Sequence, residues 1–366
     1  VTGATVSAQC LCNGTRKGLL LLHEFLLNKR LQMDKSSETA DKVDFSSDKK
    51  TETANGYLTP FAQMQLINGT PAIISVRHSS ERDVVNAMDM VFTEMKRVDS
   101  LIIKEGKKLN KKGRKKPIEY SKEFTNLISL CKKYSEETHG IFDITVRDKN
   151  KNTSYKDIII DGNRIAFANK KTQIDLSLVK NGYVIDRGIE KLKNNGISIA
   201  AINYGDTTQV IGKLPENESW KIGIRYLDQK DLILGYVSIT DKAVSVTTNP
   251  YYYKLNTIRI MESVKLLNRI TNAPVSDNQW ASVACAETAL EAAILSYVIF
   301  VSSLDKNGYP FDDSASIDYA MIYDDSDGNI KYKASKWMEE RFHQKTGYVH
   351  DYGGAPPPVC ACEVKP

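Results

Sequence analysis

The sequence lacks a long apolar run, since no stretch approaches the roughly 18 apolar residues that a membrane-spanning helix needs. Its start lacks a basic segment followed by an apolar one, so no signal peptide is expected. It also lacks an initiator methionine, so we expect a processed form or a fragment. Neither charge sign dominates, because the net charge is +5 over 366 residues. The basic run at 107–116 is more typical of a solvated loop than of a phosphate-binding surface, and no nucleic-acid partner is expected.

Cysteine is scarce in the middle of the chain, and near each end two cysteines lie two positions apart. Cys131 and Cys285 lie in apolar patterns and are predicted to be core thiols. The pairs C-L-C (10–12) and C-A-C (360–362) favour disulfides or free thiols, because zinc sites prefer C-x₂-C spacing. Glycosylation sequons are compatible with an extracytoplasmic location, either secreted or membrane-associated. They begin at Asn13, Asn68, Asn152 and Asn217.

What the chain does have is an ordinary globular composition, with 41% hydrophobic and 26% charged residues, and clear local signals. The turn residues N-G-T-P (68–71) predict a β-hairpin. Ser79 or Ser80 is expected to cap a helix over 81–100, and a second helix is expected from Ser121 to Gly140. Further helices are expected over 14–31 and 334–344.

The stretch I-D-L-S-L-V-K-N-G-Y-V-I-D (174–186) is the sharpest signal in the chain. It predicts a strand that ends at Asp175, a tight turn, and a helix that Gly182 opens. A strand over 197–202 and the loop N-Y-G-D (203–206) follow. The pattern predicts a β-α-β unit whose strand ends and helix N-terminus would bind a phosphate.

These residues resemble the FAD:protein FMN transferase family (ApbE), which has D-L-G-G-I-A-K-G-Y-A-V-D and then N-x-G-G-D at these places. Other segments resemble the family in the same order from about Tyr57 to Ser303, about two thirds of the chain. The resemblance implies an α/β (α+β) flavin-transferase domain, T-fold-like, with mixed sheets flanked by helices. These other segments are T-H-G-I-F-D-I-T-V (138–146), W-K-I-G-I-R (220–225), T-T-N-P-Y-Y-Y (247–253), L-L-N-R-I-T-N-A-P (266–274) and A-E-T-A-L-E-A-A-I-L (286–295).

The resemblance also implies a set of site residues. In the family a divalent metal, usually magnesium, bridges the FAD pyrophosphate and the protein. Matching A-E to the family's A-D without a gap places the ligands on Glu287 and Glu291, one helical turn apart. A shift by one would give Thr288 and Ala292 instead, and two solvated glutamates are the plainer alternative. The nucleotide pocket would be formed by Asp175, Gly182, Tyr183, Asp186, Gly205, Asp206, Thr247 and Thr248.

Several positions depart from the family's residues, which predicts that the transfer site is altered. Ser177 and Leu178 replace Gly-Gly, and a leucine side chain obstructs close approach of the backbone to a phosphate. Asn181 replaces the family's lysine, although Lys180 beside it could partly substitute. The other replacements are Asn249 for Gly, Lys265 for His and Asn268 for Asp.

The first residues, V-T-G-A-T (1–5), resemble the S/T-G-A-T acceptor motif of FMN-binding domains, which implies covalent FMN on Thr5. We therefore expect the end of an FMN-binding domain over 1–33, a flexible linker over 34–56, and the transferase-like domain over 57–305. A C-terminal extension with a cysteine-bearing tail is expected over 306–366.

Three functional hypotheses remain open. The first is a transferase-like protein with weakened or lost magnesium-dependent flavin transfer, whose partners are a flavin nucleotide and an acceptor protein. The second is a non-catalytic flavoprotein with covalent FMN that serves extracytoplasmic electron transfer with a redox partner. The third is a structural or surface protein that uses a dead enzyme fold.

Overall fold

The computed structural model describes residues 52–53, 56–114, 116–146, 153–225, 233–248, 275–276, 278–302, 317–327 and 329–344. The acceptor-like Thr5, the helix expected over 14–31 and both terminal cysteine pairs lie outside these residues. So do three of the replaced positions, which are Asn249, Lys265 and Asn268.

The largest element is an eight-stranded sheet, in which every pair of neighbouring strands is antiparallel. Its last two strands follow residue 305 in the chain and extend the same sheet. The strand order is β15 (Ile330–Ala334), β14 (Asp318–Asp324), β13 (Gln279–Ala286), β12 (Ala243–Thr248), β9 (Thr207–Ile211), β8 (Ala200–Tyr204), β4 (Thr70–His78) and β3 (Thr59–Ile67).

Smaller sheets flank the large one. One has the order β10 (Trp220–Arg225), β11 (Ile233–Ile239) and β16 (Phe342–Gln344), and another has β5 (Ile118–Glu119), β7 (Arg164–Phe167) and β6 (Ile158–Asp161). A short pair joins β1 (Glu52–Thr53) and β2 (Gly56–Tyr57). The 3₁₀ turns are η1 (Tyr155–Asp157) and η2 (Pro215–Asn217).

The helices begin where local capping residues predict. In α3 (Glu81–Lys112) the Ser80 hydroxyl accepts a hydrogen bond from the Asp83 amide, and in α4 (Lys122–Glu137) Ser121 does the same for Phe124. Gly140 follows α4 with a φ of 83°, as the expected helix end requires. The remaining helices are α5 (Ser177–Asn194), α6 (Ala289–Ser302) and α7 (Lys336–Glu339). No helix in the described ranges is long and apolar enough to cross a membrane.

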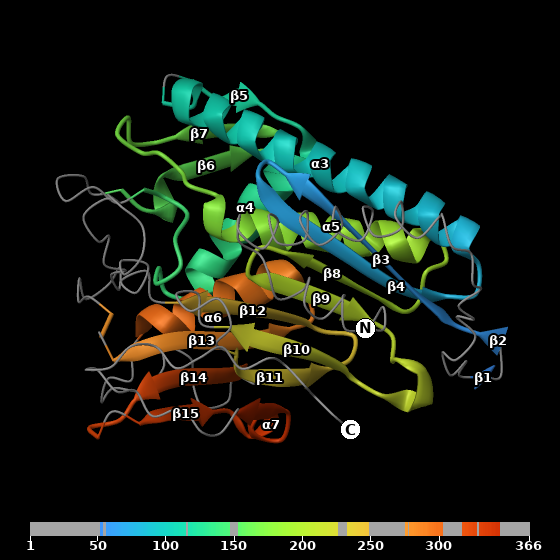
Figure 1. Ribbon diagram of the computed structural model, residues 1–366. Coiled ribbons are helices and arrows are strands. Elements are labelled where there is room, and N and C mark those ends of the chain that lie inside the picture. Colours follow the sequence, from blue (N-terminus) through green and yellow to red (C-terminus); the bar gives the residue numbers. More distant parts are fainter. Residues whose placement is uncertain are drawn as a thin grey trace, which may run out of the picture.

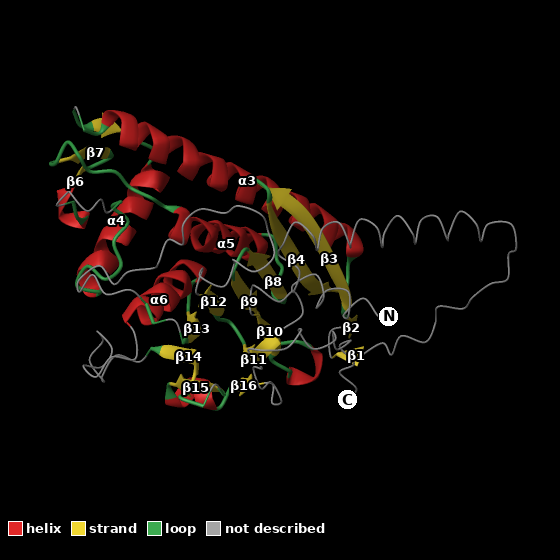
Figure 2. Cartoon of the chain, turned by 60° about the vertical axis from the view of Figure 1, so that its left-hand side comes forward, coloured by secondary structure: helices red, strands yellow, loops and turns green. Residues whose placement is uncertain are grey.

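The large sheet separates two apolar cores. Helices α3, α4, α5 and α6 gather on one side of it, as Figure 2 shows, and their apolar faces form the larger core. Strands β10, β11 and β16 and helix α7 cover part of the other face and form the smaller core with it (Figures 1 and 2). Strand β13 is buried along its whole length because it lies between both cores.

Four expectations about elements are wrong. Helix α3 continues past the expected end at residue 100 to Lys112, so the first part of the basic run at 107–116 is helical rather than a loop. The segment before α5 is not a strand of a parallel β-α-β unit, because Ile174 makes an isolated antiparallel bridge to Thr145. Helix α5 begins at Ser177, so Gly182 lies inside it rather than at its start. The helix expected over 334–344 is limited to α7, because Phe342 leaves the helix to pair with Val237 in β11.

Candidate functional site

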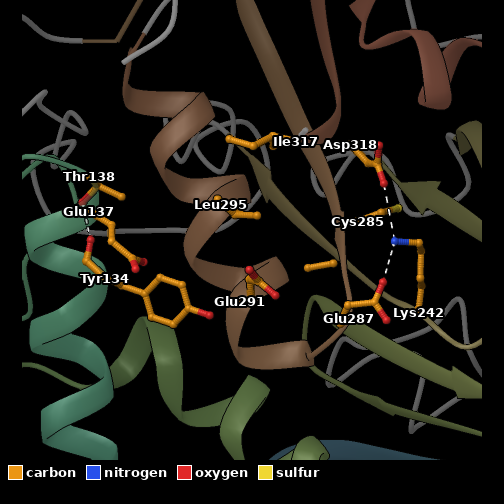
Figure 3. A pocket seen from close by; sticks show the side chains of 11 residues that line it. Tyr134, Glu137, Thr138, Lys242, Cys285, Glu287, Glu291, Leu295, Ile317 and Asp318 are labelled. Carbon is orange, nitrogen blue, oxygen red and sulfur yellow. Dashed lines mark hydrogen bonds and ion pairs between the residues drawn. The ribbon is translucent and has the colours of Figure 1, made fainter. Parts of the chain in front are cut away.

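A cleft of about 430 Å³ opens between the end of α4, the start of α6 and the neighbouring ends of β13 and β14 (Figure 3). Carboxylates dominate its polar lining, and a single lysine opposes them there. Both predicted metal ligands, Glu287 and Glu291, line it. The lining residues are Tyr134, Glu137, Thr138, Lys242, Cys285, Ala286, Glu287, Glu291, Leu295, Ile317 and Asp318.

Lys242 joins two of these carboxylates. Its ammonium lies 2.9 Å from Oε1 of Glu287 and 3.5 Å from Oδ2 of Asp318, the two dashed contacts in Figure 3. Burial alone would lower the pKa of Lys242, but the hydrogen bond and charge of Glu287, with the charge of Asp318, raise it. The first predicted ligand is therefore already neutralised by a side chain of this protein.

Glu291 is in a different environment. Burial is the main cause that raises the pKa of its carboxyl, and the nearby negative charges of Glu287 and Glu137 raise it further. Burial and the Glu291 charge also raise the pKa of Tyr134 on the opposite wall. The inner part of the cleft thus disfavours any additional negative charge.

As they stand, these residues do not form a magnesium site by themselves. Among the residues that the structure describes, no group of three or more His, Cys, Asp or Glu side chains could hold a metal ion. Magnesium needs close to octahedral oxygen coordination, and one of the two predicted ligands is paired with Lys242.

The start of α6 is held by Asp186 of α5. One carboxylate oxygen accepts a hydrogen bond from the Ala289 amide at 2.7 Å, and the other accepts one from the Leu290 amide at 3.1 Å. The Thr288 hydroxyl accepts one from the Glu291 amide at 3.2 Å. The first three amides of the helix are thus satisfied internally, so they offer little to a phosphate. Burial raises the pKa of Asp186 to about 6, although the backbone hydrogen bonds oppose this shift.

Gly182 has a packing role beside Asp186. A Cβ at this position would lie 2.6 Å from the Ala289 carbonyl oxygen and 2.7 Å from the Leu290 Cα, so only glycine lets α5 approach the start of α6. The structure therefore brings Gly182 and Asp186 together with the segment that carries Glu287 and Glu291.

The β8–β9 turn holds Gly205 and Asp206. Gly205 has a φ of 67°, and a Cβ there would clash with the Asn181 side chain, so the residue that replaces the family's lysine contacts this turn. The Asn203 side-chain amide fixes the turn by donating to the Thr207 carbonyl at 3.1 Å and to the Thr208 hydroxyl at 2.9 Å. The Asp206 side chain is exposed, yet desolvation by the surrounding protein raises the pKa of its carboxyl.

The other predicted pocket residues are spread around the fold. Thr247 bonds to the Ser296 hydroxyl of α6 at 3.0 Å, and Thr248 is the half-buried last residue of β12. Asp175 is exposed, and its carboxylate accepts a hydrogen bond from the Ser177 amide at 2.8 Å. Tyr183 is half-buried, and burial, followed by the charge of Glu123, raises its pKa to about 12. None of these four lines the cleft, and their nucleotide role stays a prediction.

Lys180 does not take the place of the missing lysine. Its ammonium donates to the fully buried Asp99 of α3 and lies 3.1 Å from the Tyr204 hydroxyl. The Asn68 side chain donates to the same carboxylate. Lys180 is therefore part of a buried network that links α3, α5 and β8.

Sequence reasoning missed Lys242, Asp318 and Glu137, which complete the charge pattern of the cleft. They come from a turn, a strand and a helix that are far apart in the chain. No spacing rule marks such residues, because only the tertiary fold brings them together.

Comparison with known proteins supports one assignment. The model of the ApbE family matches residues 68–151 and 147–309, more than half of the chain. The chain belongs to the ApbE family. The predicted fold class, an α/β (α+β) flavin-transferase domain, is thereby confirmed.

Solved ApbE structures share the fold at low sequence identity. The apo flavinyl transferase ApbE of Pseudomonas stutzeri is 17% identical with a TM-score of 0.63, over 78% of this chain and 97% of that one. The flavin transferase ApbE of Vibrio cholerae is 17% identical with a TM-score of 0.62, over 78% and 99%. The ApbE protein of Thermotoga maritima is 20% identical with a TM-score of 0.63, over 77% and 99%. No protein with a curated description matches the chain.

Proposed function

We propose that this ApbE-family protein is a flavin-nucleotide-binding homologue of the FAD:protein FMN transferases in which magnesium-dependent transfer is weakened or lost. Its natural acceptor would be a threonine in an S/T-G-A-T motif, either Thr5 or its equivalent in another protein. One observation carries the proposal, namely the ion pair between Lys242 and Glu287 at the first of the two expected metal ligands.

The chemistry explains why this pair matters. Attack on a pyrophosphate requires its negative charge to be neutralised, and a bound divalent metal would supply that neutralisation in a transferase. In this protein the amides at the start of α6 are satisfied by Asp186 and Thr288, and Lys180 is paired with Asp99. The remaining charge in the cleft is mostly negative. The protein thus has the fold of a transferase, but few of the cationic side chains and backbone amides that the structure describes in this region are free to bind a pyrophosphate.

A transfer assay with the full chain tests this function. The protein would be incubated with FAD, magnesium and an acceptor that carries the S/T-G-A-T motif, and mass spectrometry would follow FMN on the acceptor threonine. The Vibrio cholerae flavin transferase would serve as the active control. We expect detectable FAD binding with transfer much slower than in the control. Transfer at the control's rate would refute the loss of activity, and failure to bind FAD would refute nucleotide binding.

A second candidate is the covalent flavoprotein, which the V-T-G-A-T segment favours. In it, Thr5 would carry FMN in extracytoplasmic electron transfer, a location that the sequons support. Intact mass and visible absorption before and after denaturation separate the candidates. A mass increment on the peptide with Thr5 would support the flavoprotein, and flavin released on unfolding would support a binding pocket. A colourless protein in both states would favour the structural role.

A further inference from the structure

Lys242 is held in place by its backbone. It follows a tight turn between β11 and β12, in which Asp241 has a φ of 51° and accepts a hydrogen bond from the Gly212 amide at 2.7 Å. The Lys242 carbonyl accepts one from the Val210 amide of β9 at 3.0 Å. The side chain therefore starts from a fixed point on the sheet.

The ammonium is also fixed at its far end. It lies between Glu287 and Asp318, and it is 5.3 Å from the ring centre of Trp337, within reach of a cation–π contact. Only 23% of the Lys242 side chain is exposed, whereas 74% of Glu287 is. Figure 3 shows the lysine reaching the Glu287 carboxylate from the side opposite Glu291. Three contacts hold the positive charge against the mouth of the cleft.

We propose that Lys242 is the resident cation of the cleft, which neutralises Glu287 where a divalent metal would otherwise do so and thereby suppresses metal binding. This inference rests on the proposed function, because it names the residue that weakens the magnesium dependence. A dication that approached Glu287 would meet the repulsion of a fixed ammonium only a few ångströms away, and it would have to displace an existing ion pair. Magnesium gives up its water reluctantly, so the competition favours the lysine.

Titration of the full chain with Mn²⁺ alone, followed by the electron paramagnetic resonance signal of free Mn²⁺, tests the proposal. Lys242→Met keeps most of the length of the side chain, since it is one atom shorter, and removes the charge. We expect this variant to bind Mn²⁺ about tenfold more tightly than the unaltered protein, or better, because one close repulsive charge is gone. Lys221→Met is the matched control, since Lys221 is an exposed lysine of β10 and its loss changes the net charge equally. It should leave the Mn²⁺ affinity unchanged.

A second variant shows where the new metal binds. Adding Glu287→Gln to Lys242→Met should abolish the gained affinity, and circular dichroism would confirm that both variants fold. Unchanged Mn²⁺ affinity in Lys242→Met would overturn the proposal, and so would a gain that survives Glu287→Gln. The titration contains no nucleotide, so its outcome is independent of the transfer assay. A variant that gains metal but binds no FAD would leave this inference standing while the proposed function fails.

Discussion

Glu287 lies just before α6 and Glu291 lies in its first turn, so the pair does not share one helix as the sequence predicts, and the two carboxylates line one cleft in different surroundings. We predict that Glu287→Asp combined with Glu291→Thr raises magnesium-dependent binding of FAD. The shorter aspartate retracts from Lys242, and the threonine removes a negative charge while keeping an oxygen ligand. The gain should be about tenfold, the size of one added charge-assisted contact. Quenching of FAD fluorescence in magnesium and in EDTA would measure it.

The EDTA titration is the internal control, because a gain unrelated to metal would appear in both buffers. Equal affinity of the variant and the unaltered protein in magnesium would contradict either the matching of these two residues to the family's ligands or the interpretation of an altered site.

Asp186 gives the stability of the fold a predictable pH dependence. Because burial raises the pKa of Asp186 from 3.8 to about 6, the folded state holds this proton more tightly than the unfolded state does. The stabilisation that this tighter proton binding gives the folded state is therefore fully present below pH 4 and is lost as the pH rises through about 6. The Asp186→Asn variant lacks this titration. The unfolding free energy of the native protein minus that of the variant should fall by up to about 3 kcal/mol between pH 3 and pH 7, with about two thirds of the fall between pH 4 and pH 6.

Urea unfolding at closely spaced pH values would measure this difference. Above pH 7 it should stay level, since Asp186 is then ionised in both states. A difference that rises with pH would mean that the two amide hydrogen bonds from Ala289 and Leu290 outweigh burial.

At the scale of helices, the contact between α5 and α6 depends on one missing side chain. Gly182→Ala should destabilise the protein by about 1–3 kcal/mol, because its Cβ would meet the backbone of Ala289 and Leu290 and push the helices apart. Gly106→Ala in α3 is the matched control, since a Cβ there would make an ordinary 3.7 Å contact with Leu176. It should be neutral or stabilising by up to about 1 kcal/mol through helix propensity. Urea unfolding of both variants would show a clear loss of unfolding free energy for Gly182→Ala and no loss for Gly106→Ala. Equal effects would contradict a tight contact at Gly182.

The elements that the sequence predicts well are those that local chemistry specifies. Ser80 and Ser121 cap helices within three residues, and the hairpin turn has positive φ at both Asn68 and Gly69, as a type I′ turn requires. The prediction of a β-α-β unit was wrong because strand pairing is non-local, and nothing near Ile174 in the sequence specifies its pairing partner, Thr145.

In the cleft, too, features set by neighbouring residues could be predicted and features set by tertiary contacts could not. That Glu287 and Glu291 line one cleft could be predicted, because the two residues are only four positions apart in the chain, although Glu287 lies before α6 begins at Ala289. The role of Lys242 could not be predicted. Lys242 reaches Glu287 only because β12 pairs with β13 in the register that places Ala243 opposite Ala286. The residue that most changes the chemistry of the cleft is thus the one that spacing could not reveal.

At the scale of the whole molecule, the large sheet is a wall shared by two cores. Alternate residues of its central strands enter opposite cores, as Val283 and Ala284 do in β13. A loss of packing in one core should therefore disturb the strands whose opposite faces pack in the other core. A fold arranged in this way tolerates low sequence identity as long as both faces stay apolar, which agrees with its likeness to ApbE structures at 17–20% identity.

A matched pair of valines tests this shared wall. Val91 of α3 belongs to the larger core and Val237 of β11 to the smaller one, and both are fully buried. Replacing either with alanine should cost about 2 kcal/mol, and both variants should shift one common unfolding transition by similar amounts. Urea unfolding followed by tryptophan fluorescence and by far-ultraviolet circular dichroism would measure this, because Trp280 reports on the smaller core and the helices on the larger. Two separate transitions, each moved by only one variant, would mean that the cores fold independently. Coincident shifts would show that β12 and β13, which lead into the cleft, are stabilised from both sides at once.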